Sequence, residues 1–209
     1  MFMLSLDCCL DRISIAVSDE SRYVLALQEH ENHFDAASVL ASMIANVLKS
    51  ADITMKDVAV CITTVGPGSF TGIRAGISTA YGIAAACPNI RLYGITSFEA
   101  VYASYQHTSV PDNAIIALDT RRNDYYFQDA KKSLSPQVGT AEQIVDIAKA
   151  KNIELIITNK TDGLFDLASV SVVEQKITAE ALPSAVDMMD ERPLSPLYLK
   201  EAAVKVKCL

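Results

Sequence analysis

The sequence predicts an α/β protein, because short segments of apolar, β-branched residues alternate with segments rich in alanine. Residues 58–65 form an apolar run typical of a buried strand, and residues 75–86 form an alanine-rich stretch typical of a helix. Glycine is concentrated between these two segments, since five of the chain's eight glycines fall between residues 66 and 82. In this order of elements, the helix begins directly after the glycine-rich turn. The backbone N–H groups at the start of the helix therefore point into the turn.

The other elements follow in two series. In the first series, the sequence predicts strands at 3–8, 13–18, 23–28, 58–65 and 91–95 and helices at 35–50 and 71–87. In the second series, it predicts strands at 114–118, 125–129 and 155–158 and helices at 141–150 and 179–189. Residues 106–112 have the polar and proline-containing composition of a linker, so we place a boundary there, between domains 1–106 and 107–209.

The order of the first series indicates a particular architecture. The breaks at residues 11–12 and 19–21 are short and polar, as hairpin connections are, so the first three strands form a meander. A β-β-β-α-β-α order is the half-unit of the actin-like, or sugar-kinase-like (ASKHA), fold. The sequence therefore predicts two subdomains of this type, of which the C-terminal one is smaller.

The glycine-rich turn differs from three familiar motifs. The chain contains no Gly-Lys pair, which a Walker phosphate loop requires. A dinucleotide fingerprint that starts at Gly66 needs glycine where Thr71 stands, and Ser69 lacks the second glycine of a nucleophile elbow. The alternative interpretation is that the turn binds no ligand and only makes a tight connection between the strand and the helix.

The run from residue 66 to residue 76 resembles the signature of the bacterial TsaB (YeaZ) family. The matching residues are Gly66, Pro67, Gly68, Ser69, Phe70, Thr71, Gly72, Arg74 and Gly76. Residues 4–9, 118–126 and 196–200 resemble further family segments in the same order. Two departures stand out, since Cys8 and Cys9 replace hydroxyl residues and Asp124 stands where glutamate is usual.

This resemblance implies a non-catalytic subunit that dimerises with TsaD, the threonylcarbamoyltransferase that makes N6-threonylcarbamoyladenosine (t6A) in tRNA. ATP and a metal are then expected on the TsaD-like partner, and no cofactor on this chain alone. A TsaE-like ATPase is expected in the larger complex, and a homodimer when the chain is alone. The alternatives are a stand-alone ASKHA-fold enzyme, either an ATP-using kinase or a glycoprotease-like metallopeptidase, and a direct tRNA-binding module.

The two helices of the first series carry too little charge for surface helices. Asp35 is the only charged residue from 34 to 48, and Arg74 is the only one from 71 to 87. Apolar residues all round indicate burial on two sides, either by other elements of the chain or by a partner protein. We expect a partner, and the resemblance implies the same surface. The predicted interface residues are Leu40, Met43, Ile44, Val47, Gly72, Ile73, Gly76 and Ala80, with the glycines allowing close approach of a second helix.

Few residues are candidates for chemistry. In TsaD a His-x-x-x-His pair on the helix after the glycine-rich region holds a metal, and the matching residues 94–101 contain no histidine. His30 and His33 have the spacing of a metal pair but equally that of solvated loop residues, and His107 stands apart. Asp7 and Asp119 end strands, where each either retains a vestigial phosphate contact or accepts N–H bonds of its own turn. We expect no catalytic residue and no metal.

Composition bears on partners and compartment. The formal net charge of −7 argues against strong direct nucleic-acid binding, which depends on lysine and arginine. Five cysteines without a Cys-x-x-Cys spacing are typical of reduced thiols in the cytoplasm. The longest uncharged stretches carry glycine and proline and are too short to span a membrane. We therefore expect a cytoplasmic protein.

Overall fold

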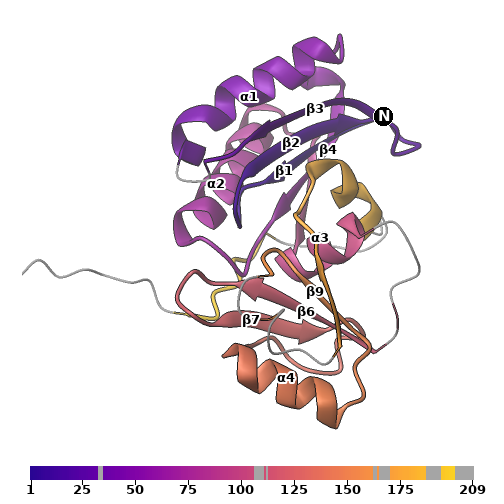
Figure 1. Cartoon of the computed structure of the whole chain (residues 1–209). Helices are drawn as coiled ribbons and strands as arrows, with labels where there is room; N and C mark the ends of the chain where they lie inside the picture. Colours follow the sequence, from indigo (N-terminus) through magenta and orange to yellow (C-terminus); the bar gives the residue numbers. More distant parts are fainter. Residues whose placement is uncertain are drawn as a thin grey trace, which may run out of the picture.

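The computed structural model describes residues 1–32, 35–105, 111, 113–161, 164, 170–186 and 194–200. Within these residues the chain forms two five-stranded mixed sheets with helices on their faces, which confirms the predicted α/β class. Figure 1 shows the layers: α1 and α2 cover the first sheet, α3 lies between the two sheets, and α4 covers the far face of the second. In this part of the chain, no helix combines the length and apolarity needed to cross a membrane.

The first sheet has the strand order β3-β2-β1-β4-β5. Its strands are β1 (Phe2–Asp7), β2 (Ile13–Ser18), β3 (Val24–His30), β4 (Val58–Thr64) and β5 (Arg91–Ile95). β1, β2 and β3 form the predicted antiparallel meander, and β4 and β5 add to β1 in parallel. Because β1 and β4 are both central and parallel, their carboxyl ends meet at one edge, next to the glycine-rich turn.

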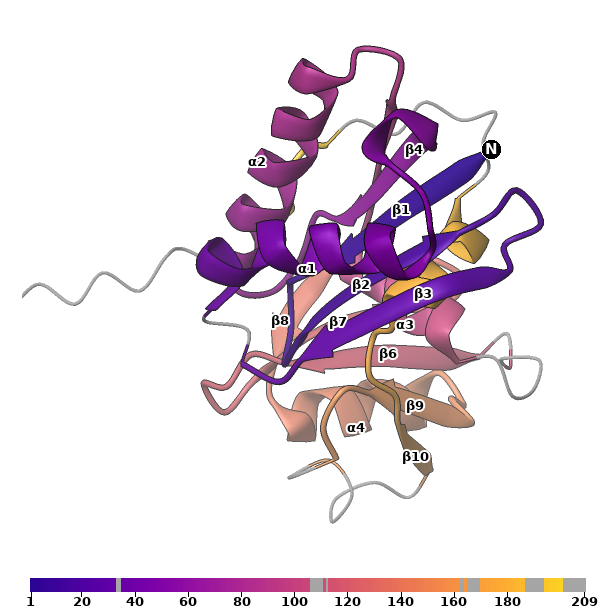
Figure 2. The ribbon, with the colours of Figure 1, turned by 90° about the horizontal axis from the view of Figure 1, so that it is seen from above.

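Helices cover both faces of this sheet (Figure 2). α1 (Ala36–Ser50) and α2 (Phe70–Ala86) pack against each other and cover the outer face. On the inner face the 3-10 helix η3 (Ala179–Ala185) packs on the strands, and α3 (Ser97–Ser104) packs against η3. A short 3-10 turn, η2 (Met55–Asp57), precedes β4. The buried stripe of each long helix therefore belongs to the chain's own core.

The second sheet has the order β10-β9-β6-β7-β8. Its strands are β6 (Ala114–Asp119), β7 (Tyr125–Asp129), β8 (Gln137–Gly139), β9 (Leu155–Thr158) and β10 (Ser171–Glu174). α4 (Ala141–Ala150) packs on its outer face through Ile144 and Ala148. The inner face, through Ile116 and Leu118, joins the core that runs through α3 to the first sheet. The two sheets thus share one hydrophobic core.

One difference from the predicted elements of the second half concerns the helix at 179–189. The α-helix expected at 179–189 is a 3-10 helix that ends at Ala185, and residues 187–189 lie outside the described part. Pro183 lies inside it and has no N–H for an α-helical hydrogen bond, so the α-helix prediction is wrong for 179–185. This segment also returns to the first sheet, where the Ala179 N–H donates to Ser14 Oγ at 2.9 Å. The expected linker lies mostly outside the described residues, so the boundary between 106 and 107 stays a prediction.

Candidate functional site

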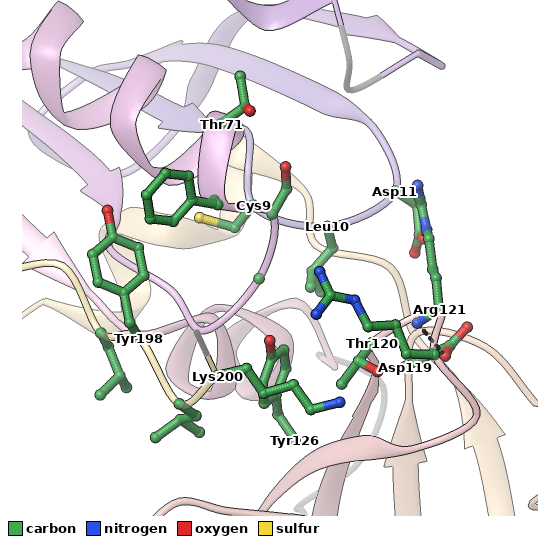
Figure 3. A pocket seen from close by; sticks show the side chains of 16 residues that line it. Cys9, Leu10, Asp11, Thr71, Asp119, Thr120, Arg121, Tyr126, Tyr198 and Lys200 are labelled. Atoms are coloured by element: carbon green, nitrogen blue, oxygen red, sulfur yellow. Dashed lines mark hydrogen bonds and ion pairs between the residues drawn. The ribbon is translucent and has the colours of Figure 1, made fainter. Parts of the chain in front are cut away.

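Four segments that are far apart in the sequence line one cavity of about 450 Å³ (Figure 3). They are the β1–β2 turn, the glycine-rich turn with the start of α2, the β6–β7 turn and the C-terminal segment. The lining residues are Cys9, Leu10, Asp11, Gly68, Ser69, Phe70, Thr71, Asp119, Thr120, Arg121, Arg122, Tyr126, Leu197, Tyr198, Leu199 and Lys200. Each segment overlaps or adjoins one of the stretches that carry the family resemblance, so the fold brings all four to one place.

The glycines of the turn allow the chain to approach itself. A Cβ atom added at Gly68 would lie 2.2 Å from the carbonyl oxygen of Cys9, and one at Gly72 would lie 1.9 Å from that of Cys8. A Cβ at Gly76 would lie 2.9 Å from Thr63 Oγ1 on β4. The glycines therefore face the β1–β2 turn and the sheet, and the prediction that Gly72 and Gly76 mark the crossing of a second helix is wrong.

The start of α2 is capped from within the chain. Ser69 is the N-cap, its Oγ accepts the Gly72 N–H at 3.3 Å, and its own N–H donates to the Cys9 carbonyl at 2.7 Å. A carbonyl oxygen thus takes a turn N–H group that would otherwise point at a ligand. The β1–β2 turn fills the glycine cradle.

Both acidic candidates accept hydrogen bonds from their own turns. Asp7 Oδ1 accepts the Cys9 N–H at 3.1 Å and the Thr64 hydroxyl at 2.6 Å. Asp119 Oδ1 accepts the Arg121 N–H at 2.8 Å. Of the two roles considered for each carboxylate, these bonds correspond to acceptance of a turn N–H. Asp119 lines the cavity, whereas Asp7 is fully buried.

Burial raises the pKa of Asp7 from 3.8 to about 6, although the bonds from Thr64 and Cys9 oppose the shift. Between about pH 4 and pH 6, the Asp7 carboxyl is therefore protonated in the folded protein and ionised in the unfolded chain. The stability of the folded protein should fall as the pH rises through this range. The shift corresponds to about 3 kcal/mol. Asp7→Asn should remove this dependence and be the more stable form at pH 7. Urea denaturation at several pH values checks this, and a difference between the two proteins that is constant with pH would contradict it.

The C-terminal segment, residues 194–200, forms a strap from α2 to the β6–β7 turn. The Leu197 N–H donates to the Val65 carbonyl at 2.8 Å. The Tyr198 ring lies 5.1 Å from the Phe70 ring, and its hydroxyl accepts from Arg74 Nε at 3.2 Å. Lys200 pairs with Asp124 at the far end. The strap thereby connects the two sheets along one side of the cavity.

A second connection joins the two halves beside the cavity, which Asp11 and Arg121 both line. Arg121 Nη2 pairs with Asp11 Oδ1 at 2.8 Å, and Asn159 Nδ2 donates to Asp11 Oδ2 at 2.7 Å. Asp11 comes from the β1–β2 turn, while both partners come from the second half. Asp11 and Asn159 lie outside every motif, and only the three-dimensional fold shows that they bond.

The other chemical candidates lie apart from the cavity. His30 Nε2 lies 2.9 Å from Asp35 Oδ2, while His33 and His107 fall outside the described residues. Within the described ranges, no three side chains among His, Cys, Asp and Glu are grouped to hold a metal ion. Cys8 and Cys9 are buried, and burial raises the pKa of the Cys9 thiol to about 12, which makes it a poor nucleophile.

The predicted interface residues are all buried in the chain itself. Six of them have side chains that pack in the core, namely Leu40, Met43, Ile44 and Val47 on α1 and Ile73 and Ala80 on α2. The two glycines, Gly72 and Gly76, are also buried. The prediction that these residues face a partner is therefore corrected, because they form the stripe that packs on the first sheet. A partner can reach only the opposite face of each helix.

Apart from Lys49 and Arg74, the exposed side chains of the two helices are uncharged and mostly small. We define the outward face as Ala37, Ser38, Ala41, Ser42 and Ala45 of α1 with Ser78, Tyr81, Gly82 and Ala85 of α2, all of which are exposed. Tyr81 is 53% exposed and is the largest of these side chains. Gly82 has nothing within 4 Å of an added Cβ, so its lack of a side chain serves no contact within the chain.

Comparisons with known proteins agree with this architecture. A protein-family model described as "TsaD: tRNA N6-adenosine threonylcarbamoyltransferase" matches residues 30–187. An uncharacterized Mycobacterium tuberculosis protein is 29% identical over 175 residues, which cover 81% of this chain and 77% of that protein. The Haemophilus influenzae "tRNA threonylcarbamoyladenosine biosynthesis protein TsaB" is 25% identical over 212 residues, covering 90% and 83%. A Pseudomonas aeruginosa structure described as similar to peptidase YEAZ has a TM-score of 0.74 at 19% identity, covering 95% and 99%.

The two sheets, with their shared core and the cavity at their strand ends, define an α/β protein of the actin-like ASKHA class. The family match covers well over half of the chain. The chain therefore belongs to that family, in its TsaB (YeaZ) branch, whose named members are tRNA threonylcarbamoyladenosine biosynthesis proteins.

Proposed function

We propose that this chain is a non-catalytic subunit that pairs with a TsaD-like threonylcarbamoyltransferase and supports t6A formation in tRNA. The outward face of α1 and α2 carries this proposal. Apart from Lys49 and Arg74, the two helices present uncharged and mostly small side chains to solvent, and one exposed tyrosine stands among them. Faces of this kind let another protein approach closely without desolvating charge.

The non-catalytic role is supported by the glycine-rich turn. The Cys9 carbonyl takes the Ser69 N–H, and the backbone of residues 8–9 packs against Gly68 and Gly72. The turn is therefore used to hold the chain together. ATP and a metal then belong on the TsaD-like partner, and a TsaE-like ATPase completes the larger complex in the cytoplasm. Self-association through the same helices would produce a homodimer when the partner is absent.

The experiment mixes the purified chain with the TsaD-like subunit of the same organism and measures mass by size-exclusion chromatography with light scattering. We expect a complex containing both proteins. The chain alone should turn over neither ATP nor peptide substrates. Absence of a complex with the catalytic subunit would contradict the proposal. Turnover of ATP or of peptides by the chain alone would support the stand-alone enzyme instead.

A further inference from the structure

Arg74 is an unusual residue for its position. Lys49 and Arg74 are the only charged residues in α1 and α2, so neither helix contains a carboxylate. Arg74 lies near the N-terminal end of α2, where the helix dipole disfavours a cation. Its side chain is exposed, next to the outward face, one turn before Ser78.

The guanidinium group is held in place by two contacts. Arg74 Cζ lies 3.8 Å from the centre of the Phe70 ring, and Nε donates to Tyr198 Oη at 3.2 Å. The ring contact and the hydrogen bond together restrict the movement of the guanidinium group. In the described part of the chain Arg74 pairs with no carboxylate, so its two terminal nitrogens remain free to donate.

We propose that Arg74 binds a carboxylate of the TsaD-like partner and thereby determines which protein docks on the outward face. This inference rests on the proposed function. A fixed guanidinium loses little side-chain entropy on binding, and its two terminal nitrogens match the two oxygens of a carboxylate. The strap takes part through Tyr198, which orients the arginine.

The need for a carboxylate opposite Arg74 distinguishes the catalytic partner from a second copy of this chain. A second copy that docks through α1 and α2 brings only cations on those helices. The nearest acids in sequence lie beyond the ends of α1, where Asp35 already bonds His30 and Asp52 follows the helix. Removal of the Arg74 charge should therefore weaken pairing with the partner and leave self-association equal or stronger.

The test measures the dissociation constant of the TsaD-like subunit by isothermal titration calorimetry for wild type, Arg74→Gln and Arg74→Lys. We expect Arg74→Gln to bind roughly tenfold to hundredfold more weakly, as for loss of a charge-assisted bidentate pair. Arg74→Lys should recover only part of this loss, because an ammonium lacks the fork geometry. Wild-type binding should weaken more steeply with added salt than Arg74→Gln binding.

Arg91→Gln is the matched control. Arg91 is also an exposed arginine near an aromatic ring, with Cζ 5.9 Å from the centre of the Tyr93 ring, but it lies on β5, outside both helices. Its replacement should leave binding unchanged. Melting temperatures of all variants verify folding, and sedimentation of each protein alone reports self-association.

Two outcomes separate this inference from the function on which it rests. If Arg74→Gln binds the catalytic subunit as tightly as wild type while Ala41→Arg does not bind, the role of Arg74 is overturned and the docking face stands. If Ala41→Arg also binds normally, both the docking face and the role of Arg74 are overturned. Equal weakening by Arg74→Gln and Arg91→Gln would likewise contradict a specific contact at Arg74.

Discussion

Replacement of Gly72 by alanine should destabilise the protein by about 3 kcal/mol or more, the upper range for added bulk in a packed site. The new Cβ would lie 1.9 Å from the Cys8 carbonyl oxygen and 3.0 Å from its carbon. Both are backbone atoms of a turn anchored by the Ser69–Cys9 bond, so they cannot rotate away as a side chain could. Urea denaturation gives the free energy of unfolding directly.

Gly82→Ala in the same helix is the control. An added Cβ at Gly82 meets nothing within 4 Å, so alanine should stabilise α2 by roughly 0.5–1 kcal/mol through its better helix propensity. The opposite signs separate the steric role of Gly72 from any general effect of glycine in the helix. If the free energy of unfolding of Gly72→Ala equals that of wild type, the β1–β2 turn and α2 are not packed as described.

The second large effect concerns docking. Ala41 is exposed at the middle of the outward face of α1, so Ala41→Arg should leave folding unchanged, since arginine is a good helix former. In a complex the new charge would be buried without a partner, at a cost of about 3–5 kcal/mol. Binding of the TsaD-like subunit should therefore weaken by about a hundredfold or more. Calorimetric titration measures this change.

Ala150→Arg provides the matched substitution on the far side of the molecule. Ala150 is an exposed alanine at the end of α4, which covers the outer face of the second sheet. This variant should bind like wild type. Loss of binding in both variants would point to a non-specific effect of charge, and loss in neither would place the interface elsewhere.

Strands and long helices could be predicted from the sequence because hydrophobic pattern and burial agree in them. β2, β5, β7 and α4 begin and end at the residues that the pattern indicates. α3, β8 and β10 were not predicted. β8 and β10 are short edge strands with mostly exposed or half-buried residues, so no apolar run marks them, unlike the fully buried four-residue β9. α3 has only eight residues, too few to show a clear helical period. The 3-10 form of η3 depends on Pro183 and on packing against the first sheet.

The candidate site could be predicted only in part. The glycine-rich turn and the ends of β1 and β6 were recognisable as motifs, but their meeting in one cavity depends on the tertiary fold. Asp11 bonds to Arg121 and Asn159 in the other half of the chain, so no local pattern reveals these contacts. Low charge identified α1 and α2 as unusual, yet it could not show which face of each helix packs on the sheet.

The most direct test of the proposed role measures t6A in a tRNA reaction with the TsaD-like subunit and its substrates. Reactions contain no added chain, wild-type chain, Ala41→Arg or Ala150→Arg, and the modified nucleoside is quantified by mass spectrometry. We predict t6A formation with wild type and Ala150→Arg, and little above background with Ala41→Arg or without the chain. Equal t6A formation in all four reactions would contradict the proposal that this chain supports the enzyme by docking through α1 and α2.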